Sequence, residues 1–166
     1  VGEHAHPEPY LGCARATCHA LTVMMAVSPA CFPLLHRAEV CLSPELVNYH
    51  TRPRPPCEQG PAAARAGATA MLDISDGLGR DAGRLARASG VGIALDEMRL
   101  ADDVAQLQRV VTEADAWRRV VEGGAEHSLL AAFPRAAALP HGWRRNGACV
   151  AGSGVALPGE PVLGGC

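Results

Sequence analysis

Apolar and polar residues follow two different periods between residues 69 and 96. Residues 69–74 form a short, mostly apolar run that predicts a strand, and the turn-forming residues 75–77 come next. From Leu78 the apolar residues recur at helical spacings of three and four, at Leu78, Ala82, Leu85 and Ala86. Gly90 is placed to end this helix, and residues 91–96 predict a second strand. The pattern therefore predicts a strand, helix and strand whose two strands lie in one sheet.

Weaker periodic segments lie on both sides of this unit. Residues 62–66 predict a short helix, and residues 101–119 predict a second long helix from the spacing of their apolar residues. Further strands are expected at residues 127–133 and 147–151, with residues 155–157 and 162–163 flanking a turn at Pro158 and Gly159. The pattern favours an α+β or α/β fold with one sheet covered by two helices.

The first part of the chain shows no comparable periodicity. We expect residues 1–46 to form a poorly defined segment that packs poorly on a domain formed by residues 47–166. Four prolines between residues 53 and 61 predict an extended linker at the start of that domain. The longest apolar stretch, residues 20–27, is too short to cross a bilayer. We therefore expect no contact with membranes and a cytoplasmic protein.

Composition narrows the function classes. A chain of 166 residues with 48% hydrophobic residues is long enough for one domain with a real core. Its formal net charge of -2 argues against nucleic acid as a partner. The seven cysteines are odd in number and irregular in spacing, which argues against a disulfide framework. Cys13, Cys18 and His19, with His4 and His6 upstream, match no standard structural zinc site.

The candidate chemistry lies where the predicted strand at residues 69–74 turns into the predicted helix. Asp73 and Asp76 are three residues apart there, with Ser75 between them. Carboxylates suit a hard cation such as Mg²⁺, and the N–H groups at a helix start suit phosphate, so a Mg²⁺-nucleotide is one candidate ligand. The alternative is that Ser75 or Asp76 caps the helix and Asp73 is a solvated strand end. Spacing alone favours the capping interpretation.

Motifs elsewhere in the chain favour the Mg²⁺-nucleotide interpretation over the capping interpretation. The matching segments are residues 52–56 (RPRPP), residues 66–78 (AGATAMLDISDGL), residues 88–92 (ASGVG), Trp117 with Gly123 and Gly124, residues 129–134, and residues 142–143 and 152–155. In order and spacing they resemble the C-terminal half of thiamine-monophosphate kinases, which belong to the aminoimidazole ribonucleotide synthetase superfamily. The resemblance implies an α+β fold with a single mixed sheet covered by two main helices.

The resemblance also implies an activity and a set of site residues. The family phosphorylates thiamine monophosphate to thiamine diphosphate with ATP, and the two Asp of its DISDGL motif help to bind Mg²⁺. These positions correspond to Asp73 and Asp76 here, and the family serine that contacts ATP corresponds to Ser75. The implied cofactors are Mg²⁺ and ATP, and the implied partners are thiamine monophosphate and ATP, with a homodimer left open.

The chain departs from the family pattern at three places. A family Gly-Gly-Glu-Asp motif, whose glutamate contacts the thiamine substrate, corresponds to Gly123, Gly124, Ala125 and Glu126, so Glu126 is the candidate substrate contact. The closing aromatic motif of the family is absent, and residues 1–46 do not resemble its N-terminal domain. We therefore expect a truncated C-terminal module of such a kinase. The alternative is an inactive remnant or a nucleotide-binding module of the same superfamily.

Overall fold

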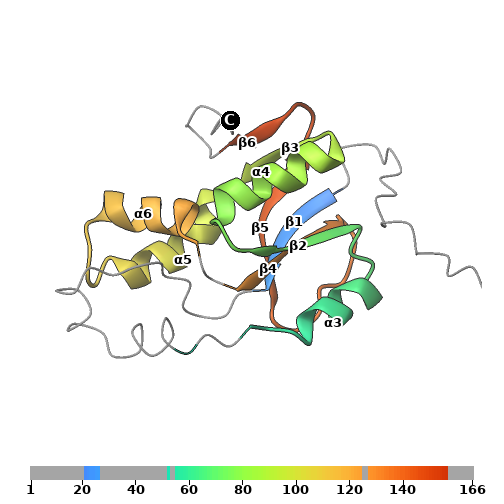
Figure 1. Ribbon diagram of the computed structural model, residues 1–166, viewed down its shortest axis with the longest axis horizontal. Helices are drawn as coiled ribbons and strands as arrows, with labels where there is room; N and C mark the ends of the chain where they lie inside the picture. Colours follow the sequence, from blue (N-terminus) through green and yellow to red (C-terminus); the bar gives the residue numbers. More distant parts are fainter. Residues whose placement is uncertain (1–20, 27–51, 53–54, 125–126, 157–166) are drawn as a thin grey trace, which may run out of the picture.

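A six-stranded sheet forms the centre of the protein in a computed structural model, which describes residues 21–26, 52, 55–124 and 127–156 (Figure 1). The strand order is β2-β4-β1-β5-β3-β6. The strands are β1 (Leu21–Ala26), β2 (Ala70–Ile74), β3 (Gly92–Leu95), β4 (Ser128–Pro134), β5 (Trp143–Val150) and β6 (Gly154–Ala156). The described helices are α3 (Gln59–Arg65), α4 (Leu78–Ser89), α5 (Glu97–Leu107) and α6 (Glu113–Glu122).

The sheet is mixed, which confirms the expected α+β class. Neighbouring strands from β2 to β3 are all antiparallel, whereas β3 and β6 pair in parallel. Strands β2 and β3 therefore run in the same direction, with β4, β1 and β5 between them. The connection through α4 crosses these three strands, so the strand, helix and strand predicted at residues 69–96 do lie in one sheet but are not neighbours.

Helices α4, α5 and α6 cover one face of the sheet, and α3 lies on the other. The larger core cluster joins residues of α4, α5 and α6 to Ile93 of β3 and Leu130 of β4. A smaller cluster joins Ala63 of α3 to Phe133 and Trp143. Because Leu130 and Phe133 project from opposite sides of β4, the two clusters occupy opposite faces of the sheet. The sequence predicts two helices over the sheet, whereas the structure has three helices on one face and the short helix α3 on the other.

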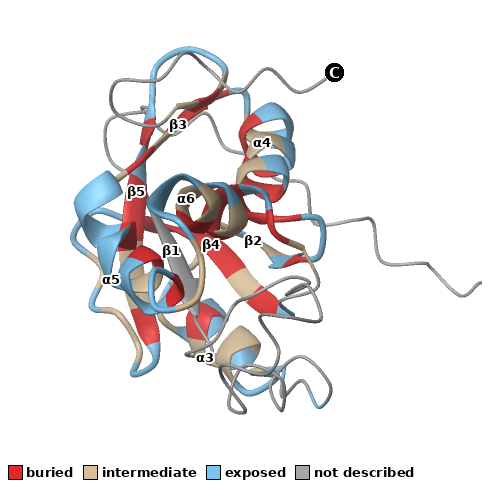
Figure 2. Cartoon of the chain, turned by 90° about the vertical axis from the view of Figure 1, so that its left-hand side faces the viewer, coloured by how far each residue is buried: buried red, intermediate tan, exposed pale blue. Residues whose placement is uncertain are grey.

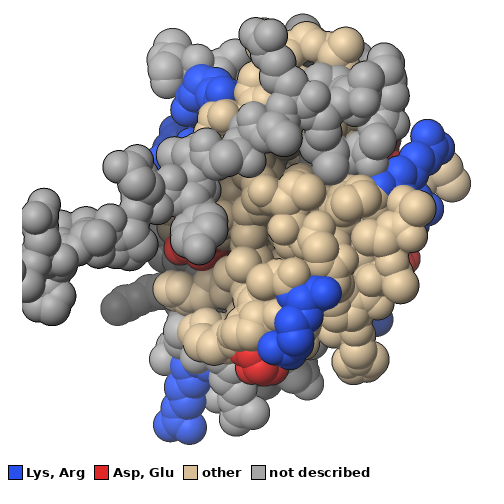
Figure 3. Space-filling view, turned by 90° about the vertical axis from the view of Figure 1, so that its right-hand side faces the viewer, with Lys and Arg blue, Asp and Glu red and all other residues tan. Residues whose placement is uncertain are grey.

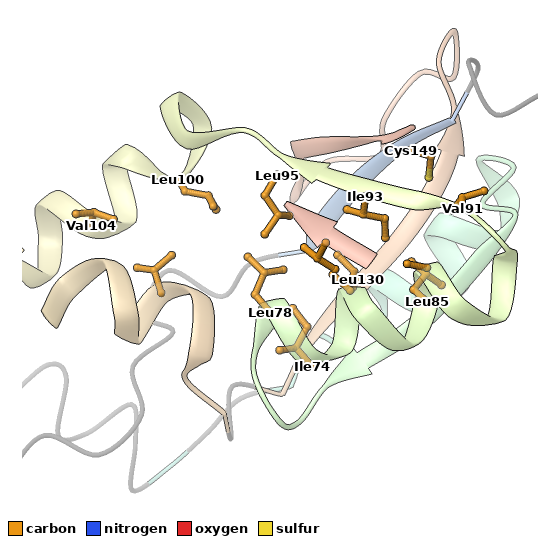
Figure 4. Close-up of a cluster of buried hydrophobic side chains, with 14 of the residues drawn as sticks. Ile74, Leu78, Leu85, Val91, Ile93, Leu95, Leu100, Val104, Leu130 and Cys149 are labelled. Carbon is orange, nitrogen blue, oxygen red and sulfur yellow. The ribbon is translucent and has the colours of Figure 1, made fainter. Parts of the chain in front are cut away.

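Helix α4 matches its sequence pattern closely. Its buried apolar residues are Leu78, Ala82, Leu85 and Ala86, and they lie on the side turned toward the sheet, whereas its exposed residues face outward (Figure 2). Figure 4 shows Leu78 and Leu85 pointing into the space shared with Ile74, Ile93 and Leu130. Gly90 adopts the left-handed conformation that ends the helix, with φ of 65°.

The expected helix at residues 101–119 is two helices. Helix α5 begins at Glu97, where the side chain of Asp96 accepts a hydrogen bond from the N–H of Met98. Helix α6 begins after Thr112, whose hydroxyl accepts a hydrogen bond from the N–H of Asp115 at 3.2 Å. A capping threonine competes with helix continuation, so the chain turns between residues 108 and 112 although the apolar spacing runs on through it.

Strand β1 differs from the expectation for residues 1–46. Residues 21–26 pair with β4 on one side and β5 on the other, so this part of the chain supplies a strand to the middle of the sheet. The run is apolar almost throughout, and it therefore lacks the alternation that identifies half-buried strands. The sequence predicts that residues 1–46 pack poorly on the domain, whereas residues 21–26 are hydrogen-bonded to two of its strands.

Other expectations fall partly outside the described residues. The strand expected at residues 147–151 is longer and starts at Trp143, and the strand expected at 155–157 is β6. The turn at Pro158 and Gly159 and the residues of the weighed zinc site lie outside the described part. No helix among the described residues is long and apolar enough to cross a membrane. On the face shown in Figure 3, a few Arg and Asp or Glu side chains are scattered over a described surface that is mostly uncharged.

Candidate functional site

The turn between β2 and α4 carries all three of the described residues predicted for the site. Ile74 at the end of β2 and Leu78 at the start of α4 are both fully buried and anchor the turn from either side. Between and beside these anchors, Asp73, Ser75 and Asp76 are exposed. Burial of the two anchors holds the backbone while the polar residues face solvent, so the turn can present them to a ligand.

A buried carboxylate that the sequence analysis did not single out organises this turn. Asp81, in the first turn of α4, has no exposed surface. Its Oδ2 accepts hydrogen bonds from the N–H groups of Ser75 and Asp76, both at 2.9 Å. Gly77, the residue before the helix, has no side chain to cap it, and the carboxylate of Asp81 reaches back from the first turn of the helix to the two N–H groups that precede Gly77.

Arg84 completes a closed ring of interactions. Its Nη1 donates to Oδ1 of Asp81 at 2.5 Å, and its Nη2 donates to Oδ2 of Asp76. The two hydrogen bonds, the larger with Asp76, raise the pKa of Arg84 above its ordinary value. Asp76 is thus held twice, through its backbone N–H by Asp81 and through its carboxylate by Arg84.

Two glycines let a second segment approach the turn at backbone distance. Gly77 has φ of 105°, and a Cβ on it would lie 2.6 Å from the carbonyl oxygen of Glu122. A Cβ on Gly124 would lie 2.6 Å from the carbonyl oxygen of Ser75. The segment that follows α6 therefore lies directly against the turn, which only glycine permits. Glu126, the candidate substrate contact, follows two residues later and lies outside the described residues.

The two carboxylates predicted to bind metal belong to different parts of the fold: Asp73 is in β2, and Asp76 is in the turn that follows it. Ala70, Leu72 and Ile74 contribute to the core beneath α4, so alternation along the strand places Asp73 on the other face. Asp76 instead lies with Arg84 of α4. Within the described residues, no group of three or more His, Cys, Asp or Glu side chains could hold a metal ion. A cation on Asp73 and Asp76 would therefore take its other ligands from water, phosphate or another part of the protein.

The hydrogen bonds of the turn also bear on which part of a Mg²⁺-nucleotide, the cation or the phosphate, these residues could bind. The N–H groups of Ser75 and Asp76 are used by Asp81 and are not offered to a phosphate. Asp76 and Asp81 bring two carboxylates to this turn, where both pair with the guanidinium of Arg84, and Asp73 adds a third carboxylate from the other face of β2. This excess of negative charge suits a cation, so the donor set fits Mg²⁺ better than a bare anion.

Comparisons with known proteins agree with the resemblance identified from the motif. No protein-family model matches the chain. A thiamine-monophosphate kinase from Mycobacterium tuberculosis is 42% identical over 123 residues, which is 72% of this chain and 36% of the relative. The crystal structure of thiamine-monophosphate kinase from Aquifex aeolicus has a TM-score of 0.68 at 24% identity, covering 86% of this chain and 51% of that one.

A solved structure described as AaThiL complexed with AMPPCP and TMP has the same TM-score of 0.68 at 22% identity. It covers 87% of this chain and 50% of that chain. These two likenesses to solved structures show a shared fold, and the curated relatives confirm the suspected similarity to thiamine-monophosphate kinases. The chain spans about a third of the length of the curated relatives from Mycobacterium tuberculosis that it matches, and about half of these solved structures.

Proposed function

We propose that this chain is the C-terminal module of a thiamine-monophosphate kinase, which transfers a phosphoryl group from ATP to thiamine monophosphate. The observation that carries the proposal is the turn between β2 and α4, where Asp73, Ser75 and Asp76 are exposed on a backbone anchored by a buried carboxylate. The sequence similarity to curated thiamine-monophosphate kinases, 42% over 72% of the chain, supports the same assignment.

In this proposal Asp73 and Asp76 hold Mg²⁺ and Ser75 contacts ATP. Mg²⁺ in nucleotide sites is usually bound by one or two carboxylates together with phosphate oxygens and water, which is the number of exposed carboxylates that the turn offers. When bound, Mg²⁺ neutralises the charge that develops on the transferred phosphoryl group. Glu126 contacts the thiamine substrate in place of the family glutamate, because it follows the Gly123–Gly124 segment that lies against the turn.

The reaction needs little covalent chemistry from the protein. An oxygen of the thiamine monophosphate phosphate forms a bond to the γ-phosphorus of ATP, the bond from that phosphorus to the β–γ bridging oxygen breaks, and ADP leaves. The protein contributes by orienting donor and acceptor in line and by supplying fixed charge around them. The rigid turn of this chain, held by Asp81 and flanked by Gly124, suits that task.

The remaining parts of the site belong to the proposal as well. A relative matched over 36% of its length has most of its residues outside the match, and we propose that residues corresponding to them supply further metal ligands and nucleotide contacts. The structure described as a complex with AMPPCP and TMP supports ATP and thiamine monophosphate as the substrates. A cytoplasmic location, where ATP is available, and assembly as a homodimer complete this proposal.

Matched carboxylate variants test the site. In the full-length protein, by which we mean the longer kinase whose C-terminal module we propose this chain to be, Asp73→Asn and Asp76→Asn should each remove most of the Mg²⁺-dependent gain in AMPPCP affinity measured by calorimetry. Because both side chains are exposed, the melting temperature should barely change. Asp102→Asn, an exposed carboxylate on α5, is the control and should leave binding unchanged. Equal nucleotide affinity with and without Mg²⁺ in the unsubstituted protein would contradict the metal site.

Turnover measurements distinguish an active kinase from the alternative of an inactive remnant or nucleotide-binding module. The full-length protein should form thiamine diphosphate from thiamine monophosphate and Mg-ATP. The two Asn variants should lower kcat while leaving the melting temperature nearly unchanged. Nucleotide binding without any transfer to thiamine monophosphate would favour the inactive-remnant alternative.

A further inference from the structure

The ring formed by Asp76, Asp81 and Arg84 does more than a helix cap requires. A side-chain cap would satisfy an N–H group of the first turn of α4, but a Cβ on Gly77, at the position before α4, would lie 2.6 Å from the carbonyl oxygen of Glu122. The protein instead buries the carboxylate of Asp81 completely, which is unfavourable unless the charge is paired and hydrogen-bonded. Here both conditions are met, because Asp81 accepts two backbone N–H groups and pairs with Arg84.

The same ring fixes the side chain of one predicted metal ligand. Arg84 uses one nitrogen for the buried Asp81 and the other for Asp76, so the guanidinium is itself held in place while it holds Asp76. A planar guanidinium can bridge two carboxylates in this way, whereas a single ammonium group cannot reproduce the fork. The second oxygen of Asp76 is left for another partner. Asp76 is 45% exposed at its side chain, so solvent and ligands can reach it.

We propose that Asp81 and Arg84 are positioning residues, which preset the carboxylate of Asp76 for a Mg²⁺-nucleotide. This inference rests on the proposed function, because it assumes that Asp76 binds the metal. Hydrogen bonds that orient metal-binding carboxylates commonly change metal affinity by 10- to 100-fold when they are removed. Arg84 is half-exposed, so its effect belongs at the lower end of this range.

The central test compares two arginines on one helix. Arg84→Met in the full-length protein should reduce the Mg²⁺-dependent gain in AMPPCP affinity about tenfold. Its AMPPCP affinity without Mg²⁺ should stay close to that of the unsubstituted protein, whereas its melting temperature should fall, because the buried carboxylate of Asp81 loses its charged partner. Arg87→Met is the matched control, because Arg87 is exposed on α4 one turn further on and its loss changes the net charge equally. Arg87→Met should leave the Mg²⁺-dependent gain unchanged.

A double substitution shows whether Arg84 acts through Asp76. If it does, Arg84→Met should have no further effect on Mg²⁺-dependent binding in a protein that already carries Asp76→Asn. Arg84→Lys should recover only part of the loss, since an ammonium group cannot bridge both carboxylates. An equal effect of Arg84→Met with and without the carboxylate of Asp76 would overturn the proposal.

Asp81 provides an independent readout by NMR. Asp81→Asn should speed hydrogen exchange at the amides of Ser75 and Asp76 at least tenfold, because the neutral amide accepts their hydrogen bonds more weakly. It should also lower the Mg²⁺-dependent gain. If this variant does not fold, the arginine variants alone decide the outcome. Unchanged exchange at both amides in a folded Asp81→Asn protein would show that Asp81 does not position the turn.

The outcomes separate this inference from the proposed function. If Asp76→Asn abolishes the Mg²⁺-dependent gain but Arg84→Met behaves like Arg87→Met, only the positioning role fails. If Arg84→Met instead strengthens the Mg²⁺-dependent gain, Arg84 competes with the metal for Asp76 and the positioning role is wrong. If Asp73→Asn and Asp76→Asn are both without effect, the metal site fails, and the positioning role fails with it.

Discussion

Gly124→Ala introduces a single methyl group at the contact between the turn and the segment after α6. Its Cβ would lie 2.6 Å from the carbonyl oxygen of Ser75 and 3.3 Å from the Cα of Asp76. Real Cβ contacts below 3.0 Å essentially do not occur, so one backbone segment must move by about 0.4 Å even to reach that limit. Because both partners are backbone, neither can relieve the clash by changing a rotamer. We therefore expect Gly124→Ala to displace the turn that carries Ser75 and Asp76.

The expected magnitude follows from the cost of overpacking. Inserting a methyl group into a tightly packed contact costs about 1 to 3 kcal/mol, which for a domain of this size lowers the melting temperature by roughly 2 to 12 °C. Misplacement of a site by about 1 Å can cost up to 100-fold in rate, so a shift of a few tenths of an ångström should be visible in Mg²⁺-dependent AMPPCP affinity. Calorimetry and thermal unfolding measure the two effects separately.

A second glycine supplies the control. A Cβ on Gly83, in the middle of α4, would meet only Val155 Cγ2 at 3.8 Å, an ordinary contact distance. Gly83→Ala should therefore stabilise the helix by about 0.5 to 1 kcal/mol and leave binding unchanged. The reasoning fails if Gly124→Ala unfolds at the same temperature as the unsubstituted protein and binds Mg²⁺-AMPPCP equally well.

Three further predictions concern other parts of the chain. Thr112→Ala removes the hydroxyl that caps α6 and should cost about 1 kcal/mol, a loss that Thr112→Ser should largely prevent in thermal unfolding. The hydrogen bond from Thr112 and the charge of Arg118 lower the pKa of Asp115 below its ordinary 3.8, so Asp115 contributes stability above that pH and loses it as the pH falls through the lower folded value. The melting temperature of Asp115→Asn should accordingly differ from that of the unsubstituted protein at neutral pH and converge with it in acid. The 166-residue polypeptide assayed by itself should form no measurable thiamine diphosphate, and robust turnover would show that it already holds donor, metal and acceptor in line.

Local patterns in the sequence predicted the unit from β2 to β3 well. Leu78, Ala82, Leu85 and Ala86 form the buried side of α4, and Gly90 ends it as expected, because helical spacing and glycine act over a few residues. The exposed turn with Asp73, Ser75 and Asp76 was also found from sequence. What these residues bind stays a prediction, because the described structure contains their positions and not their ligand.

The ring around Asp76 could not be read from the same patterns. Arg84 lies on the polar side of α4, and the sequence offers no sign that it bridges two carboxylates. Asp81 did leave a signal, since it lies beside Ala82 at the edge of the apolar face, where a charged residue needs a partner. The contact between Gly124 and Ser75 joins residues 49 positions apart, and only the folded chain brings them together.

Strand β1 ties the folding of the sheet to the order in which the ribosome releases the chain. Residues 21–26 emerge before both of their partners, β4 and β5, which begin about a hundred residues later. At about 5 to 20 residues per second, the nascent chain holds an apolar strand without its neighbours for roughly 5 to 20 s. Until β1 is inserted, the sheet exists only as two separate pieces, β2-β4 and β5-β3-β6. During the earlier interval β1 exposes both of its edges, so a chaperone, or a second nascent chain, can most readily intervene then.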